Sequence, residues 1–345
     1  MLPFLNDYQH GGHPAVLAYL QSIQGQAFPG YGEDAICSAA ADRIRAWVGI
    51  KGAPVHFVSG GTQANLTVIA SLLRPHEGVI AATTGHINAH ETGAVEATGH
   101  KVLTVENAQG KVTADAVREV VTSHANDEAF EHIVKPSMVY VSHTTELGTI
   151  YQRAELEALS TTCRALGLPL YLDGARLGYG LTAEGGDLTI ADVARLTDVF
   201  TIGGTKQGAL FGEAIVFTNA ALAKDFRYHI KQRGGMLAKG WLLGAQFDAL
   251  LKDDLYLSLS RHANALAQRL RDGLQNLGFT LAGASPSNQQ FVRLPVSVAD
   301  ALAESCAFGT ITQGEKERVV RFCTSWATTG EQVDELLQVM ERLRG

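Results

Sequence analysis

Cysteine is scarce in this sequence, and no two cysteines stand close together. The 345 residues include four of them, Cys37, Cys163, Cys306 and Cys323, and no CxxC pair. This spacing favours neither a disulfide framework nor a zinc knuckle. We therefore expect reduced thiols that are mostly buried.

Basic clusters and long apolar runs are also missing. The formal net charge is −7, and no group of Lys and Arg is dense enough to bind a nucleic acid backbone. Residues 1–7 lack a basic segment followed by an apolar one, and no apolar stretch is long and clean enough to span a bilayer. These features predict a cytoplasmic protein with neither nucleic acid nor membrane as a partner.

Several common catalytic motifs are absent. The glycine-rich segment at residues 58–65 is neither GxGxxG nor GxxxxGK[ST], which argues against dinucleotide and P-loop sites. GxSxG does not occur, and this removes the simplest serine hydrolase. His86 and His90 are four residues apart with Glu91 beside them, but the remainder of a HExxH zinc site is missing. No metal site is predicted.

The sequence does contain enough apolar residues, 46% of the total, for a large core, and its length suits one large domain and a smaller one. From about residue 55 to 217, short β-rich runs alternate with helical stretches such as Ala114–His124 and Arg153–Leu166. The predicted strands are His56–Ser59, Val79–Ala82, Val102–Val105, Met138–Ser142, Pro169–Leu172, Val199–Ile202 and Ala214–Phe217.

Strands that are separated by helices need crossover connections, which favour a mostly parallel sheet with helices on both faces. The sequence thus predicts a large α/β domain over residues 1–239. Beyond it come long helices such as Leu257–Leu277, a strand at Phe291–Leu294 and an amphipathic helix at Gly330–Leu343. We expect a small α+β domain over residues 240–345.

The segment Val58-Ser-Gly-Gly-Thr-Gln-Ala-Asn65 ends one predicted strand and begins a helix. Free N–H groups at a helix start, with glycines that allow close approach, can bind an anion. A tight turn capped by Thr62 explains the same residues equally well.

Two later strand ends each carry a charged residue. Asp173 follows a buried-looking strand, at the edge where open α/β sheets bind ligands, and its carboxylate can keep a pyridine nitrogen protonated. Lys206 ends the turn Thr201-Ile-Gly-Gly-Thr-Lys, where desolvation would make its amine a nucleophile. Taken alone, Asp173 is as well explained as a turn cap or a partner of Arg176, and Lys206 as a solvated surface residue. The order of anion turn, acid and lysine is the stronger signal.

In this order the motifs resemble the threonine aldolase and β-eliminating lyase family, within the pyridoxal phosphate (PLP)-dependent fold type I superfamily of aspartate aminotransferase. The resemblance covers nearly the whole chain. It is carried by Tyr31-Gly-Glu-Asp34, Ser59-Gly-Gly-Thr-Gln-Ala-Asn65, His86-Ile with Glu91-x-Gly-Ala94, Leu172-Asp-Gly-Ala-Arg-Leu177, Thr205-Lys-Gln-Gly-Ala209 and Val320-Arg-Phe-Cys-Thr-Ser325.

The resemblance implies how the cofactor would be held in the large domain. Gly61 and Thr62 would bind the PLP phosphate, and His86 would stack on the ring. Asp173 would pair with the ring nitrogen, and Lys206 would hold the cofactor as a Schiff base. PLP would then serve as an electron sink for chemistry at Cα of an amino acid.

It also implies the substrate contacts and the reaction. Arg176 and Arg321 would bind the substrate carboxylate, together with Asn6, which replaces the family's serine and can still donate a hydrogen bond. The expected reaction cleaves the Cα–Cβ bond of threonine, allo-threonine or a related β-hydroxy-α-amino acid such as phenylserine, and yields glycine and an aldehyde. His86 and His143 are the candidates to contact the hydroxyl. His143 is otherwise explained as a surface histidine at a strand end.

One departure from the family lies in Arg233-Gly-Gly-Met-Leu237. Many members have, at the position of Leu237, an arginine that reaches the site of a neighbouring subunit, and Arg233 or Lys239 is the candidate to replace it. The variant resembles a branch with phenylserine aldolases and aromatic β-eliminating lyases. Because sites of this fold type are completed across a two-fold interface, the resemblance implies a homodimer or homotetramer.

Two other functions stay open at this point. A PLP-dependent β-eliminating lyase or amino-acid racemase would share the cofactor contacts and break a different bond. A non-catalytic phosphate-binding or nucleotide-binding α/β protein would use the glycine-rich turn for another ligand. Identification of the products distinguishes the first alternative from an aldolase. A PLP absorbance band that responds to borohydride distinguishes a PLP enzyme from the second alternative.

Overall fold

The computed structural model describes residues 1–107 and 109–344. Its helices are α1 (Pro14–Ser22), α2 (Ala35–Val48), α3 (Gly61–Leu72), α4 (His86–Ala89), α5 (Ala114–Asn126), α6 (Arg153–Leu166), α7 (Leu177–Leu181), α8 (Ile190–Leu196), α9 (Phe226–Gln232), α10 (Trp241–Leu250), α11 (Leu255–Asn276), α12 (Val296–Ala303) and α13 (Gly330–Leu343). Its strands are β1 (Leu2–Pro3), β2 (Val55–Val58), β3 (Glu77–Ala82), β4 (Lys101–Val105), β5 (Lys135–Ser142), β6 (Leu170–Asp173), β7 (Val199–Gly203), β8 (Glu213–Phe217), β9 (Thr280–Leu281), β10 (Gln289–Pro295), β11 (Cys306–Ala307), β12 (Gly309–Gln313) and β13 (Glu317–Cys323).

The large sheet has the strand order β2-β8-β7-β6-β5-β3-β4. The pairs from β7 through β4 are parallel, whereas β8 runs antiparallel to both of its neighbours, β2 and β7. Each strand that the sequence predicts between residues 55 and 217 lies in this sheet, within a few residues of its predicted bounds. The predicted mostly parallel α/β domain is confirmed.

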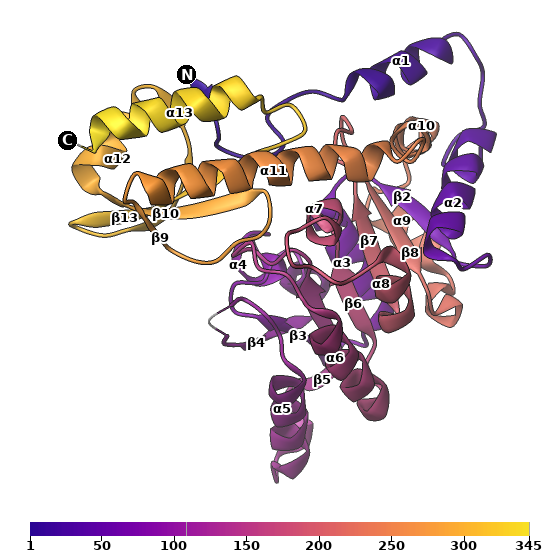
Figure 1. Ribbon diagram of the computed structural model, residues 1–345. Helices are drawn as coiled ribbons and strands as arrows, with labels where there is room; N and C mark the ends of the chain where they lie inside the picture. Colours follow the sequence, from indigo (N-terminus) through magenta and orange to yellow (C-terminus); the bar gives the residue numbers. More distant parts are fainter. Residues whose placement is uncertain (108, 345) are drawn as a thin grey trace.

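The two faces of the sheet bury separate cores, because successive residues of a strand point to opposite faces. Ile80, Val139 and Leu170 share one core with helices α2, α6, α8 and α10. Val79 and Met138 share the other with α3 and α9. Helices therefore cover both faces of the sheet (Figure 1).

The C-terminal part forms a second layer beside the large sheet. Strands β12, β13, β10 and β9 make an antiparallel sheet that packs with α12 and α13 against the C-terminal half of α11. In Figure 1 these elements gather at one end of the long helix α11. The strand predicted at Phe291–Leu294 lies within β10, and the predicted helix Gly330–Leu343 has the bounds of α13.

The predicted domain division between residues 239 and 240 stays a prediction, and the packing crosses it in two places. Helix α10 packs against α1 and α2, and its Phe247 belongs to a core of the large sheet. At the other end of the chain, β1 pairs in parallel with β11, and Leu2 and Phe4 belong to the core of the C-terminal layer. Figure 1 accordingly shows the N-terminus beside α13.

All four cysteines are buried free thiols, as expected from their spacing. Within residues 1–107 and 109–344, no helix is both long and apolar enough to cross a membrane.

Candidate active site

A pocket of about 320 Å³ opens at the carboxyl ends of the parallel strands of the large sheet. Ser142 ends β5, Asp173 ends β6, and Lys206 follows β7, so the strand direction brings their side chains to one edge. The sequence-predicted site residues that line this pocket are Gly61, Thr62, His86, Asp173, Arg176 and Lys206.

Asp173 is buried and is held on both of its oxygens. Oδ1 accepts a hydrogen bond from the Ala175 N–H at 2.8 Å. Oδ2 accepts one from the Tyr140 hydroxyl at 2.7 Å and one from Asn65 Nδ2 at 2.9 Å. These three hydrogen bonds fix the orientation of the carboxylate at the pocket, as the binding of a protonated ring nitrogen requires.

Asn65 connects Asp173 to the histidine of the pocket. Its Nδ2 also donates to Glu91 Oε1 at 2.7 Å, and its Oδ1 accepts from the Tyr171 hydroxyl at 2.7 Å. Glu91 Oε1 lies 2.7 Å from His86 Nδ1, and the Glu91 side chain is fully buried. The carboxylate thus orients the His86 ring, one third of which is exposed at the pocket.

Gly203, the last residue of β7, allows the turn after β7 to pack closely against the turn after β6. A Cβ on Gly203 would lie 2.4 Å from the Ala175 carbonyl oxygen, so only glycine allows this approach. The two turns carry Lys206 and Asp173 into the same pocket.

Lys206 is buried there among several charged groups. Its pKa lies below the ordinary value, first because burial disfavours the ammonium and next because Arg176 is a neighbouring cation. The charges of Asp7, Glu213 and Asp173 act in the opposite direction. A lysine with a lowered pKa supplies more neutral amine, which is the form that attacks a carbonyl.

Helix α3 begins at the pocket without a side-chain cap. Gly60 is its N-cap residue, and a Cβ placed on Gly60 or Gly61 would meet no atom within 4 Å. The first N–H groups of the helix have no intrahelical acceptor, and the helix dipole favours negative charge at this end. Gly61 and Thr62 therefore provide a suitable site for a phosphate. The alternative that Thr62 caps the helix does not apply, because it lies inside α3.

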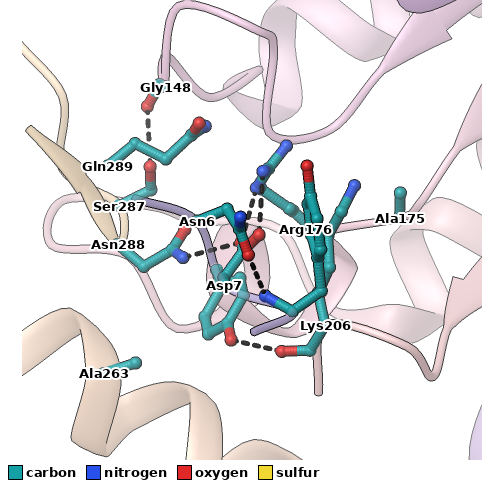
Figure 2. A network of polar contacts seen from close by, with 12 residues as sticks. Asn6, Asp7, Gly148, Ala175, Arg176, Lys206, Ala263, Ser287, Asn288 and Gln289 are labelled. Carbon is teal, nitrogen blue, oxygen red and sulfur yellow. Dashed lines mark hydrogen bonds and ion pairs between the residues drawn. The ribbon is translucent and has the colours of Figure 1, made fainter. Parts of the chain in front are cut away.

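Arg176 is anchored by an acid from the N-terminal segment. Its Nε and Nη2 donate to the two oxygens of Asp7, at 2.7 and 3.0 Å, and Asn288 Nδ2 donates to Asp7 at 2.9 Å (Figure 2). Burial alone would raise the pKa of Asp7, but the charges of Arg176 and Lys206 and these hydrogen bonds bring it below its ordinary value. The pairing leaves Nη1 and one Nη2 hydrogen as donors for a ligand carboxylate.

His143 is not brought to the pocket. It is buried, its Nδ1 accepts from the Tyr151 N–H at 3.3 Å, and a Cβ on Gly180 would lie 2.5 Å from its Nε2. Burial, with the charge of Lys111, lowers its pKa to about 4, so the imidazole is neutral. His143 is thus buried and lies outside the pocket lining, and its contact with the substrate hydroxyl stays a prediction.

Arg321 lies on β13, beside the pocket and outside its lining. Its Nη1 donates to Gln289 Oε1 at 3.2 Å, and its buried Nε has no partner in the described part of the chain. The charges of Arg321 and Arg176 both add to the burial effect that lowers the pKa of His90. Both guanidinium groups therefore lie near enough to His90 for their charges to act on it.

Asn6, Arg233 and Lys239 do not line the pocket either. Asn6 Oδ1 accepts a hydrogen bond from the Tyr8 N–H at 3.0 Å, and Tyr8 itself lines the pocket. Arg233 ends α9, where its Nη1 donates to Gln232 Oε1 at 3.0 Å. Their predicted roles stay predictions.

Residues of the pocket lining that sequence reasoning missed include Tyr8, Glu146, Phe211 and Glu213. Glu213 is the first residue of β8, and a carboxylate next to a predicted buried strand is a signal that could have identified it. Glu146 lies three residues after His143, in the loop that follows β5. For Tyr8 and Phe211 the sequence offers no comparable signal. Among the described residues, no cluster of His, Cys, Asp and Glu could hold a metal ion.

Comparison with known proteins places this chain in a protein family. The family model of beta-eliminating lyases matches residues 12–296. The low specificity L-threonine aldolase of Pseudomonas aeruginosa is 32% identical over 99% of this chain and 98% of its own.

Two solved structures extend the comparison. A threonine aldolase of Leishmania major superposes with a TM-score of 0.97 and 44% identity over the whole of both chains. An aspartate aminotransferase of Thermus thermophilus superposes with a TM-score of 0.72 at 16% identity, covering 99% of this chain and 91% of the other. The latter likeness concerns the fold alone and confirms the predicted fold type.

Proposed function

The chain belongs to the beta-eliminating lyase family, and on that premise we propose that it is a PLP-dependent aldolase of β-hydroxy-α-amino acids. Its substrate would be threonine, allo-threonine or a related compound such as phenylserine, and its products glycine and an aldehyde. The full-length similarity to threonine aldolases supports this activity. The observation that carries the proposal is that two residues line the same pocket: Asp173, whose carboxylate accepts three hydrogen bonds, and the buried Lys206.

The pocket residues fit PLP group by group. The uncapped start of α3 suits the phosphate, and Asp173 suits a protonated pyridine nitrogen. The His86 ring, oriented by Glu91, offers a flat surface for an aromatic ring, and Lys206 offers an amine for covalent attachment of the aldehyde. When bound, PLP would supply an electron sink for the electron pair left at Cα.

The remaining residues bind and orient the substrate. Arg176 would bind the carboxylate with the donors that Asp7 leaves free, and Arg321 would assist it. Two fixed hydrogen bonds to the carboxylate set the rotation of the amino acid and so choose which bond at Cα breaks. Asp7 acts indirectly, because it keeps the Arg176 side chain in place.

The activity is tested by incubating the purified protein and PLP with threonine, allo-threonine, phenylserine, serine and tyrosine. We expect glycine and the matching aldehyde from at least one β-hydroxy substrate. Ammonia or a keto acid without glycine would instead favour the β-eliminating lyase. No visible PLP band, or one unchanged by borohydride, would contradict PLP binding through a lysine.

A variant pair locates the chemistry. Lys206→Ala should lose the borohydride-sensitive band and lower turnover about a thousandfold or more, with an unchanged circular dichroism spectrum. Lys224→Ala changes an exposed lysine and should behave like the wild type. Wild-type activity in Lys206→Ala would place the catalytic amine elsewhere. The cytoplasmic location and the homodimer or homotetramer remain part of the proposal.

A further inference from the structure

The loop after β5 presents a carboxylate to the pocket where the sequence suggested a histidine. His143 points into the protein interior against Gly180, whereas Thr144 and Glu146 line the pocket with Ser142. The pocket therefore receives an acid from this loop.

The two oxygens of Glu146 differ in their contacts. Oε1 accepts from the His86 N–H at 3.0 Å and from the Ser142 hydroxyl at 2.7 Å. Oε2 is closed off from bulk solvent and has no partner among residues 1–107 and 109–344. One oxygen thus fixes the side chain, and the other is an acceptor that no described residue uses.

The surroundings of Glu146 make it a stronger base than an ordinary glutamate. Burial raises its pKa, and the charge of Asp173 raises it further. The hydrogen bond from Ser142 and the charge of His86 act in the opposite direction. Tyr140 and Tyr151 are further titratable groups near this carboxylate, and both are kept neutral because burial raises their pKa values above the ordinary value.

We propose that Glu146 is the catalytic base that takes the proton from the β-hydroxyl of the substrate. This inference rests on the aldolase function proposed above. Cleavage of the Cα–Cβ bond releases an aldehyde only if the hydroxyl loses its proton. Glu146 lines the pocket, and its Oε2 has no hydrogen-bond partner in the described part of the chain.

The step balances without any further reactant. The hydroxyl O–H bond breaks, and its proton moves to the Glu146 carboxylate. The oxygen electron pair forms the C=O bond of the aldehyde, while the electrons of the breaking Cα–Cβ bond remain at Cα, for which PLP, when bound, would supply the electron sink. Cα then takes up one proton to give glycine, and Glu146 gives up the proton that it took from the hydroxyl, so the overall reaction neither gains nor loses a proton.

Glu146→Gln tests the proposal because the amide oxygen can still accept from the His86 N–H and the Ser142 hydroxyl. We expect kcat for threonine or phenylserine to fall about 100-fold or more. Exchange of a glycine Cα proton in heavy water involves no β-hydroxyl and should continue within about threefold of the wild type. PLP affinity of the cofactor-free protein and its circular dichroism spectrum should not change.

Each contrary result has a defined meaning. Retention of kcat within about fivefold would overturn the role of Glu146, and so would equal loss of substrate cleavage and glycine exchange, which indicates general damage to the site. A wild type that releases no glycine would refute the aldolase function itself. Glu119→Gln, an exposed carboxylate changed in the same way, serves as the matched control.

A second variant covers the case in which Glu146→Gln does not fold. Ser142→Ala removes a hydrogen bond that lowers the pKa of Glu146. The rising limb of kcat against pH, which reports ionisation of the base, should therefore move to higher pH. An unmoved limb in an active Ser142→Ala enzyme would contradict the assignment.

Discussion

Three carboxylates, Asp173, Glu146 and Glu213, line one pocket and differ in the hydrogen bonds that they accept. Asp173 is held on both oxygens and Glu146 on one, while Oε2 of Glu213 is buried with no partner in the described part of the chain. Burial raises the pKa of Glu213 to about 8, against the opposing charge of Lys206. The pKa of a carboxyl group in this pocket thus depends on its surroundings.

The raised pKa of Glu213 predicts a pH-dependent stability. A carboxyl whose pKa is near 8 when folded and close to 4.3 when unfolded binds its proton more tightly in the folded state. Its contribution to stability is fully present below pH of about 4 and is lost as the pH rises through about 8. In the cofactor-free protein, Glu213→Gln should lessen the fall in thermal midpoint between pH 5.5 and 9. Parallel curves for the two proteins would contradict the assignment.

Motif order could predict the residues that follow strands, such as Asp173, Lys206 and His86, because the carboxyl ends of parallel strands meet at one edge. It could not reveal their partners. Asp7 is separated from Arg176 by 169 residues, and nothing local in the sequence joins them. The choice between Glu146 and His143 depends on which way a loop turns, which spacing alone does not determine.

At the scale of elements, the strands of the large sheet were predictable because apolar β-rich runs alternate with helices along the chain. The two-residue strands β1, β9 and β11 have no periodicity to detect, and the pairing of β1 with β11 joins distant segments. Strand β12 is largely exposed on both sides, so it lacks the buried positions that mark a strand. Strands that are very short or exposed are thus among those that sequence reasoning missed.

A negative charge at the start of α3 should have opposite effects on the stability of the protein and on its affinity for PLP. Gly61→Asp would place a negative charge in the first helical turn, where the helix dipole stabilises it by about 0.3–1 kcal/mol. The same charge would repel a phosphate, so PLP affinity should fall at least about tenfold. Cofactor-free thermal unfolding and a PLP titration measure the two effects.

Gly61→Asn is the matched control for that variant, because it adds nearly the same volume without charge. It should bind PLP more tightly than Gly61→Asp. Equal losses of affinity in both variants would show that side-chain size matters and that the helix start does not select an anion.

At the scale of the whole molecule, the N-terminal segment joins the two layers. Phe4 N–H donates to the Ala307 carbonyl at 3.0 Å, and the Cys323 N–H donates to the Phe4 carbonyl at 2.9 Å. A few residues later, Asp7 pairs with Arg176 of the large domain and with Asn288 of the C-terminal layer. The geometry of the Arg176 side chain therefore depends on how this segment packs (Figure 2).

Phe4→Ala tests that dependence. Phe4 is fully buried in the C-terminal core and packs edge-on against Phe322, so its removal should cost roughly 3–5 kcal/mol in the free energy of unfolding. The exposed neighbour in Leu5→Ala should change stability by less than about 0.5 kcal/mol. Where Phe4→Ala remains folded, KM should rise because Asp7 no longer holds Arg176 firmly. Urea unfolding and substrate kinetics measure the two effects, and an unchanged KM in a destabilised protein would show that the segment supports the fold without positioning the site.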